Sequence, residues 1–237
     1  MKEYKEEFID FLLRERALLI DIFNLFKLKS GRLSPHFINT GVFNDGESIA
    51  ELGDFYAKTI ANNFKREDYD IIFGPAYKGI PLAVATAISL QHLGINKGFS
   101  FNRKEPKGYG EATKQDKQKN WIVGYEIKDG DRILMVDDVL TTGGTKYEAI
   151  NLLNDIADNL EYVGLVIAVD RQEVGPDGKD AIKQFEQKTG MPVIPIVNIL
   201  EIKTYLSEEG KISEAELKGI DDYLKKYGNE EVKRWVK

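Results

Sequence analysis

The chain has 237 residues, 42% of them hydrophobic, which is enough to bury one sizeable core, so we expect a single domain with elaborations. It contains no cysteine, which excludes disulfide bridges, thiolate metal sites and cysteine nucleophiles. Its formal net charge of -6 argues against nucleic acid as the main partner, so any phosphate site must be a local cluster of cations.

The chain starts with MKEYKEEFIDFLLRERALLI, which predicts an amphipathic helix. This stretch is too charged for a secretory signal, and no apolar run is long enough to span a bilayer. A cytoplasmic enzyme is therefore expected.

The segment 28–41, LKSGRLSPHFINTG, combines cations with a turn and an apolar end. Lys29 and Arg32 flank Gly31, and Phe37 and Ile38 follow. Two interpretations stay open. The segment is either an irregular hairpin or a flap that binds a planar anionic base.

Residues 70–74 predict a strand, and a helix is expected over about 80–93. The connection between them, within GPAYKGIPLA, carries Tyr77 and Lys78. Lys78 either faces water in a Gly/Pro-rich turn or meets a pyrophosphate oxygen as a compact point charge.

A strand is expected over 97–101, and the polar stretch 103–120 follows it. This stretch has no apolar period and is too long for an ordinary connection. It is either a solvated run of charges or a mobile lid that brings cations onto a leaving pyrophosphate, with hinge freedom at Gly108 and Gly110. Its leading cations are Arg103, Lys104 and Lys107.

Residues 132–136, RILMV, predict a buried strand that ends at two adjacent acids, Asp137 and Asp138. A loop of threonine and glycine follows, and then the apolar period of a helix. Such a loop cradles phosphate at a helix N-terminus, while the acids can accept hydrogen bonds from ribose hydroxyls. A Walker loop is excluded because GxxxxGK[ST] is absent, and a GxGxxG fingerprint is absent too. A solvated acidic turn remains the simpler alternative.

Two further strands are expected over 161–170 and 192–197, with a helix over about 179–189 between them. Alternating strands and helices predict a parallel sheet. The fourth strand ends in DRQE, so Arg171 is expected at the same edge as the two acids. There it can bind a carboxylate with two hydrogen bonds or form a structural ion pair with a neighbouring acid.

The only two histidines are His36 and His92. His92 falls in an apolar helix and is expected to be structural, and the sequence gives His36 no catalytic partner. A catalytic triad and a metal site built from histidine and cysteine are therefore excluded.

Four segments and the later DRQE appear in the order typical of one family. The segments are LKSGRLSPHF, GPAYKGIPLA, FNRKEPKGYGE and VDDVLTTGGT. With them the chain resembles the orotate phosphoribosyltransferases, type I phosphoribosyltransferases, over roughly residues 20–205. The resemblance implies an α/β fold in which helices flank a central parallel sheet under a small N-terminal hood. It further implies one domain over 1–237, with hood and flanking elements at about 1–66 and 198–237 and a mobile lid at 103–120.

The resemblance implies transfer of ribose 5-phosphate from phosphoribosyl pyrophosphate to N1 of orotate, in pyrimidine (UMP) biosynthesis. The products are orotidine 5′-phosphate and pyrophosphate. It also implies Mg²⁺ carried mainly by substrate oxygens, with no direct protein ligand, and a homodimer in which each lid serves the neighbouring subunit's site.

Site residues follow from the same resemblance. Lys104 and Asp138 are implied to be catalytic. Binding of phosphoribosyl pyrophosphate is implied for Tyr77, Lys78, Arg103, Lys104, Lys107, Tyr109, Asp137, Asp138, Val139, Leu140, Thr141, Thr142, Gly143, Gly144 and Thr145. Binding of orotate is implied for Lys29, Phe37, Ile38, Thr141 and Arg171.

The lid departs from the family pattern at two places. Tyr109 stands where the family usually has a histidine, and tyrosine brings no positive charge at neutral pH, so we expect a weaker contribution there. GEATKQDKQ replaces the usual GEGG ending. Two alternative functions stay open: a phosphoribosyltransferase for another base such as a purine, and a non-catalytic sensor of phosphoribosyl pyrophosphate.

Overall fold

The computed structural model describes residues 1–28, 30–107, 113–140, 143–175 and 177–236. Its centre is a six-stranded sheet with the order β10-β9-β8-β5-β6-β7. The predicted parallel strands are confirmed, and the edge strand β7 runs antiparallel to β6. The short apolar run of β7 gave no clear strand pattern in the sequence. The strands are β5 Ile71–Gly74, β6 Gly98–Asn102, β7 Ile122–Gly124, β8 Arg132–Asp137, β9 Glu161–Asp170 and β10 Val193–Asn198.

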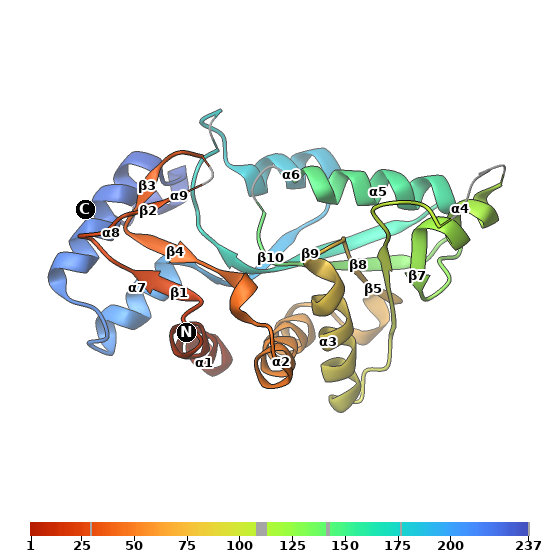
Figure 1. The fold of residues 1–237 in the computed structure, drawn as a ribbon, viewed down its shortest axis with the longest axis horizontal. Coiled ribbons are helices and arrows are strands. Elements are labelled where there is room, and N and C mark those ends of the chain that lie inside the picture. Colours follow the sequence, from red (N-terminus) through yellow and green to blue (C-terminus); the bar gives the residue numbers. More distant parts are fainter. Residues whose placement is uncertain (29, 108–112, 141–142, 176, 237) are drawn as a thin grey trace.

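Helices cover both faces of the sheet (Figure 1). One face carries α1 (Glu3–Arg14), α2 (Gly46–Asn63) and α3 (Gly79–His92), and the other carries α5 (Gly144–Ile156) and α6 (Ala181–Thr189). Side chains alternate between the two faces along each strand. Two separate core clusters therefore form, one containing Ile72 and the other containing Ile71 and Phe73. Covering both faces explains why the central strands are continuous apolar runs.

A smaller layer stands beside one end of the main sheet (Figure 1). It consists of two antiparallel pairs, β1 with β4 and β2 with β3, and we call it the hood. Three C-terminal helices pack beside it through a third apolar cluster that includes Leu28, Ile199 and Tyr223. The remaining elements are β1 Leu18–Ile20, β2 Phe26–Lys27, β3 Leu33–Ser34, β4 His36–Ile38, η1 Thr40–Val42, η2 Arg66–Asp68, α7 Ile199–Glu208, α8 Glu214–Tyr227 and α9 Glu230–Lys233.

The stretch expected to be a loop over 103–120 contains a helix, α4 (Lys114–Trp121). The side chain of Thr113 caps this helix by accepting a hydrogen bond from the backbone N–H of Asp116. Lys117 pairs with Asp155 of α5 at 3.0 Å. The helix has no apolar face and is held by capping and surface ion pairs, so its sequence shows no apolar period. In the described part of the chain, no helix combines the length and apolar character needed to cross a bilayer.

The end of β5 approaches the start of α3 too closely for side chains. A Cβ atom added to Gly74 would lie 1.9 Å from the carbonyl oxygen of Gly79. A Cβ added to Gly79 would lie 2.7 Å from the carbonyl carbon of Gly74. Two glycines therefore allow the backbone to turn tightly from the strand into the segment that carries Tyr77 and Lys78.

Replacing Gly74 with alanine should lower the free energy of unfolding by about 3 kcal/mol, because the added methyl meets backbone that cannot move aside. Chemical denaturation followed by circular dichroism measures this loss. Gly46→Ala is the matched control, since a Cβ at Gly46 in the first turn of α2 meets no atom within 4 Å. Equal stability of the two variants would contradict the close approach.

Candidate active site

The two adjacent acids lie at the carboxyl end of β8, between the ends of β5 and β9. Asp137 is 5% exposed and Asp138 is 8% exposed. Buried carboxylates require partners, because an unpaired charge away from water is costly. Each acid has its own cation, and the two cations come from different elements.

Asp138 is bonded on both carboxylate oxygens. Its Oδ2 accepts from Lys78 Nζ at 2.7 Å and from Thr40 Oγ1 at 2.9 Å. Its Oδ1 accepts from the backbone N–H of Val139 at 2.7 Å. Burial raises the pKa of the Asp138 carboxyl, but the hydrogen bond and charge of Lys78 outweigh it and hold the pKa below its ordinary value of 3.8. Asp138 is therefore an anion at neutral pH.

Asp137 faces a different lysine. Its carboxylate forms an ion pair with Lys146, in the first turn of α5, and each side chain is 7% exposed. Burial raises the pKa of Asp137, and the charge of Lys146 opposes that rise. The backbone carbonyl of Asp137 accepts from the buried hydroxyl of Tyr56 in α2, at 2.7 Å. Asp138 is therefore bonded to Lys78 of the turn after β5. Asp137 is held by the buried side chains of Lys146 and Tyr56.

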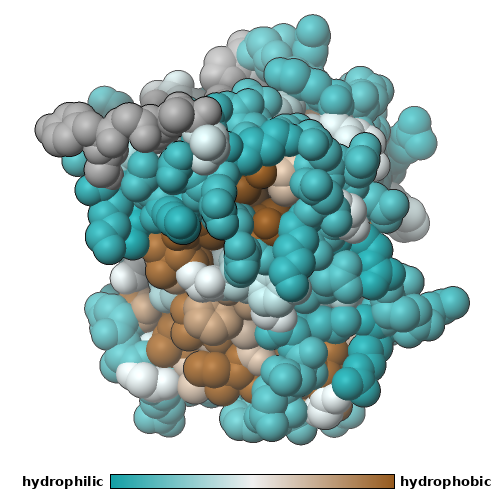
Figure 2. Space-filling model, turned by 90° about the vertical axis from the view of Figure 1, so that its right-hand side faces the viewer, coloured by the Kyte–Doolittle hydropathy of each residue, from teal (hydrophilic) through white to brown (hydrophobic). Residues whose placement is uncertain are grey.

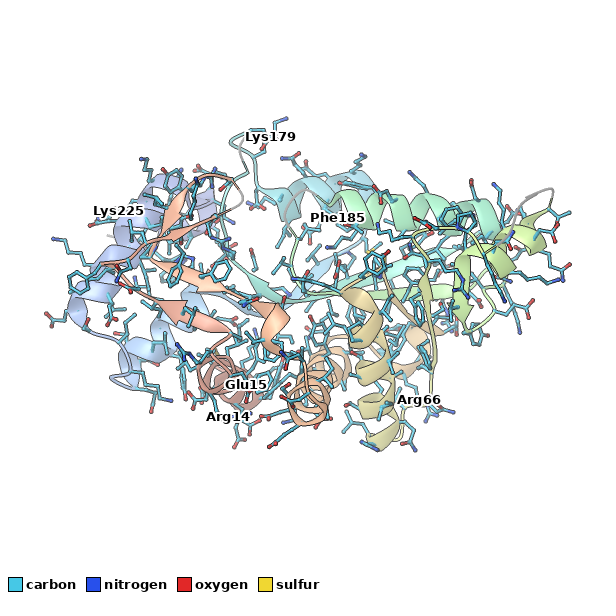
Figure 3. All side chains as sticks on the ribbon, viewed as in Figure 1. Arg14, Glu15, Arg66, Lys179, Phe185 and Lys225 are labelled. Carbon is cyan, nitrogen blue, oxygen red and sulfur yellow. The ribbon has the colours of Figure 1, made fainter. Side chains whose placement is uncertain are left out.

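The threonine–glycine loop ends in a left-handed turn that starts α5. Gly143 has φ +74° and is the N-cap of the helix. A Cβ there would lie 3.0 Å from Tyr147 and 3.3 Å from Phe185. Phe185, from α6 (labelled in Figure 3), belongs to the core cluster on this face of the sheet and packs beside the turn. Gly144 and Thr145 form the first turn, whose free N–H groups suit an anion.

Part of the predicted phosphate loop is described. Val139 and Leu140 are half-buried and join β8 to the loop. Thr141 and Thr142 lie outside the described residues.

The turn after β5 is fixed to the neighbouring strand. The backbone N–H of Ala76 donates to Oδ1 of Asn102, at the end of β6, at 3.0 Å. The next peptide bond, Ala76–Tyr77, is cis, and the Tyr77 side chain is 71% exposed. The structure thus brings Lys78 onto Asp138 and presents Tyr77 to solvent at the same edge of the sheet.

The predicted lid begins as an extension of β6. The backbone N–H of Arg103 donates to the carbonyl of Trp121 at 2.7 Å, and that of Lys107 donates to the carbonyl of Asn120 at 3.1 Å. Lys104 forms an ion pair with Glu148, one turn into α5, at 3.3 Å. Lys104 is therefore held beside the helix that starts at the phosphate loop, and not on the acids. Gly108, Tyr109 and Gly110 lie outside the described residues.

Arg171 belongs to a second charged cluster, built around Glu173. Arg171 Nη2 and Glu173 Oε1 are 2.5 Å apart, which is the structural ion pair left open by the sequence. Tyr223 of α8 donates to the same carboxylate at 3.0 Å, and Arg32 of the hood lies 3.7 Å from it. Burial raises the pKa of Glu173, but the nearby His36, whose Nε2 lies 3.6 Å from Oε1, and the charge of Arg171 outweigh it and hold the pKa below its ordinary value.

The hood residues predicted near a base are separated by the strand alternation. In β4 the half-buried Phe37 stacks on Phe26, with ring centroids 5.7 Å apart, whereas Ile38 packs against the main core. His36 is fully buried, and burial lowers the pKa of its imidazole below 6.5. Lys29 lies outside the described residues. His92 was expected to be structural, but it is exposed at the last residue of α3.

Four residues of the site were missed in the sequence: Thr40, Tyr56, Lys146 and Glu173. Thr40 lies within the INTG run and Glu173 within DRQE, so their neighbours were already candidates. Lys146 directly follows the threonine–glycine loop, and its position on the inward face of α5 was the available signal. Nothing in the local sequence points to Tyr56, which reaches Asp137 from α2 only in the folded chain.

Comparisons with known proteins agree with this geometry. A family model described as a phosphoribosyl transferase domain matches residues 40–196. The chain is 40% identical over 231 residues to the orotate phosphoribosyltransferase of Shewanella oneidensis, covering 97% of this chain and 100% of that relative. It is 41% identical over 233 residues to that of Nitrosococcus oceani, covering 98% of this chain and 99% of the relative. A crystal structure of orotate phosphoribosyltransferase from Francisella tularensis matches with a TM-score of 0.79 at 35% identity, covering 94% and 100% of the two chains.

Proposed function

The chain belongs to the orotate phosphoribosyltransferases, within the phosphoribosyl transferase domain family, and we propose that it transfers ribose 5-phosphate from phosphoribosyl pyrophosphate to N1 of orotate. The products are orotidine 5′-phosphate and pyrophosphate, and the reaction serves de novo pyrimidine (UMP) biosynthesis. The fold is the type I phosphoribosyltransferase fold expected from the sequence. One observation carries the proposal: an ionised, lysine-paired Asp138 stands at the strand end where the anion-binding start of α5 begins.

The donor is proposed to lie along the carboxyl end of β8. Asp138 accepts hydrogen bonds from the ribose hydroxyls, and the loop from Val139 to Thr145 binds the 5-phosphate with the N-terminus of α5. Lys78, 2.7 Å from Asp138, lies where it can meet both the ribose and the pyrophosphate, beside Tyr77.

Ribosyl transfer needs charge placement more than a covalent nucleophile. As the bond to pyrophosphate breaks, the ribose ring gains positive charge and the leaving group gains negative charge. The Asp138 carboxylate stabilises the positive charge on the ribose, and Lys78 and Lys104 stabilise the negative charge on the leaving pyrophosphate. Cations that meet the pyrophosphate more strongly as it leaves lower the barrier.

The base is proposed to bind between the hood and the end of β9. Orotate carries a carboxylate, which suits Lys29 and Arg171, while Phe37 and Thr141 contact the ring and Ile38, packed against the main core, holds β4 in place beside it. Arg171 already shares one carboxylate, that of Glu173, and its planar guanidinium can share a second. A purine has no carboxylate to occupy this position.

Mg²⁺ is proposed to enter with the donor. Within the described ranges, no three His, Cys, Asp or Glu side chains come together as a metal site, and both acids of β8 are paired with lysines. These residues fit a metal held by pyrophosphate and ribose oxygens, where it would neutralise charge on the leaving group. The protein's part is to bind that complex through Lys78 and Tyr77.

A homodimer is proposed, with each lid serving the neighbouring subunit's site. Figure 2 shows an apolar area among hydrophilic side chains at the end of the molecule that carries α3, β6 and β7. On α3, Ile88 is 54% exposed, and Leu93 just beyond it is 52% exposed. Exposed apolar patches of this kind mark interaction surfaces. Because the phosphorylated donor cannot cross a bilayer unaided, we propose a cytoplasmic location.

A steady-state assay with Mg²⁺ and phosphoribosyl pyrophosphate tests the function. Orotate should be turned over at least about a hundredfold more efficiently than adenine or hypoxanthine, because a site built for a carboxylate discriminates strongly against bases that lack one. Turnover of a purine in place of orotate would identify a different base specificity. Binding of the donor without turnover of any base would identify a sensor.

A further inference from the structure

We propose that Lys146 is a positioning residue for the donor, holding Asp137 and the carbonyl of Val139 in the arrangement that ribose 5-phosphate requires. The inference deepens the proposed function and rests on it. Lys146 is not itself among the residues predicted to contact the donor. It acts through the two residues at the beginning of the phosphate loop.

Lys146, at the end of the loop, bonds to the two residues Asp137 and Val139 at its beginning. Its ammonium pairs with the Asp137 carboxylate and also donates to the carbonyl of Val139 at 2.8 Å. Lys146 directly follows the loop in sequence, and its side chain returns to the residues from which the loop starts. A side chain that joins both ends of a binding loop reduces the conformational freedom lost when the ligand binds.

Burying a lysine at position 146 is energetically unfavourable for two reasons. It is 6% exposed, and lysine is almost never buried unless it is paired. It also lies in the first turn of α5, where the helix dipole disfavours a cation. An apolar pair of similar volume would often serve stability as well. A buried lysine at this position is therefore better explained by a requirement of the loop than by a requirement of the core.

Lys146 also sets the charge that the donor meets. Asp137 and Asp138 are adjacent, and the hydroxyl of Tyr56 donates to the backbone carbonyl of Asp137, so it compensates neither carboxylate. With Lys146 on Asp137 and Lys78 on Asp138, each carboxylate has one compensating cation. Without Lys146, the polyanionic donor would approach an uncompensated buried acid, or Asp137 would take up a proton and become a hydrogen-bond donor.

The test is the variant Lys146→Met, which keeps the length of the side chain and removes its charge. Isothermal titration calorimetry should show a Kd for phosphoribosyl pyrophosphate raised about tenfold or more, the scale of one lost charge-assisted contact. KM for the donor should rise in parallel while kcat at saturating donor stays within about threefold, because the reacting groups are unchanged. An unchanged Kd together with a lowered melting temperature would show a structural role only and overturn the proposal.

A double-variant cycle keeps the proposal falsifiable if Lys146→Met folds poorly. The variant Asp137→Asn/Lys146→Met lacks both charges of the buried pair, so neither residue is left as an unpaired ion. If Lys146 acts through Asp137, the double variant should raise the donor Kd by clearly less than the product of the two single effects. Multiplicative effects would mean that the two residues act independently.

Lys188→Met is the matched control. Lys188 is an exposed lysine whose ammonium lies 3.9 Å from the ring centroid of Tyr147, the residue after Lys146 on α5. Its loss should leave the donor Kd unchanged. Calorimetry needs no acceptor, so failure of the wild type to use orotate would overturn the proposed function without touching this measurement.

Discussion

Replacing Lys104 with alanine should lower kcat by about two to three orders of magnitude, the usual loss for a group that stabilises charge only in the transition state. The Kd for orotate should stay within about twofold, because the proposed contact is to the leaving pyrophosphate. In the structure Lys104 is held by Glu148 at 3.3 Å and is exposed enough to change partner when the donor is bound. Steady-state kinetics and orotate titration measure the two quantities separately.

The control for Lys104 is Lys225→Ala. Lys225 is an exposed lysine of α8 that lies 3.6 Å from Asp222, far along the chain from the lid (Figure 3). It should retain the wild-type kcat. If Lys104→Ala also retained the wild-type kcat, the lid would have no part in the chemistry.

Replacing Asp138 with asparagine should lower kcat/KM for phosphoribosyl pyrophosphate by about a hundredfold to a thousandfold. The amide keeps the shape of the carboxylate but removes its charge, so the developing positive charge on the ribose loses its counter-ion. Lys78 also loses the partner it meets at 2.7 Å. Initial rates at varied donor concentration measure the effect. Asp222→Asn, at an exposed ion pair, is the control and should change nothing.

Mixing the two impaired variants tests whether lids are shared between subunits. After subunit exchange, a heterodimer of Lys104→Ala with Asp138→Asn has one site with an intact acid and an intact lid, provided that each lid serves the partner's site. Activity should then recover well above that of either variant alone. If each lid serves its own subunit, both sites stay impaired and no activity returns.

The main sheet was predictable because its strands are short apolar runs that end in turn-forming or acidic residues. The run 132–136 followed by two acids predicted a strand with both acids at its carboxyl end, and the structure places Asp137 and Asp138 there. The orotate phosphoribosyltransferase family and the enzyme class, also expected from the sequence, are confirmed by relatives that match nearly the whole chain. In each of these strands, a pattern within a few neighbouring residues is enough to predict the local structure.

The remaining parts depend on contacts between distant segments. Helix α4 is held by capping and by surface ion pairs, so its sequence resembles a solvated loop. Tyr56 reaches Asp137 across 81 positions of sequence, and no pattern around Tyr56 indicates this. The pairing of Lys146 with Asp137 was not predicted, because burial of a lysine depends on the fold around it. The predicted roles of the site residues stay predictions until the variants are measured.

The Glu173 cluster has a consequence for how the molecule opens. The Glu173 carboxylate, 11% exposed, accepts from Tyr223 of α8, pairs with Arg171 after β9 and lies 3.6 Å from His36 of β4, so three segments from distant parts of the chain meet at one point. Separating any one of these segments would remove a neighbour from a largely buried carboxylate, which is costly. The hood, the C-terminal helix and the base end of the site should therefore open as one cooperative unit, with similar protection against hydrogen exchange. A ligand that binds at the base end would then slow exchange in α8 as well.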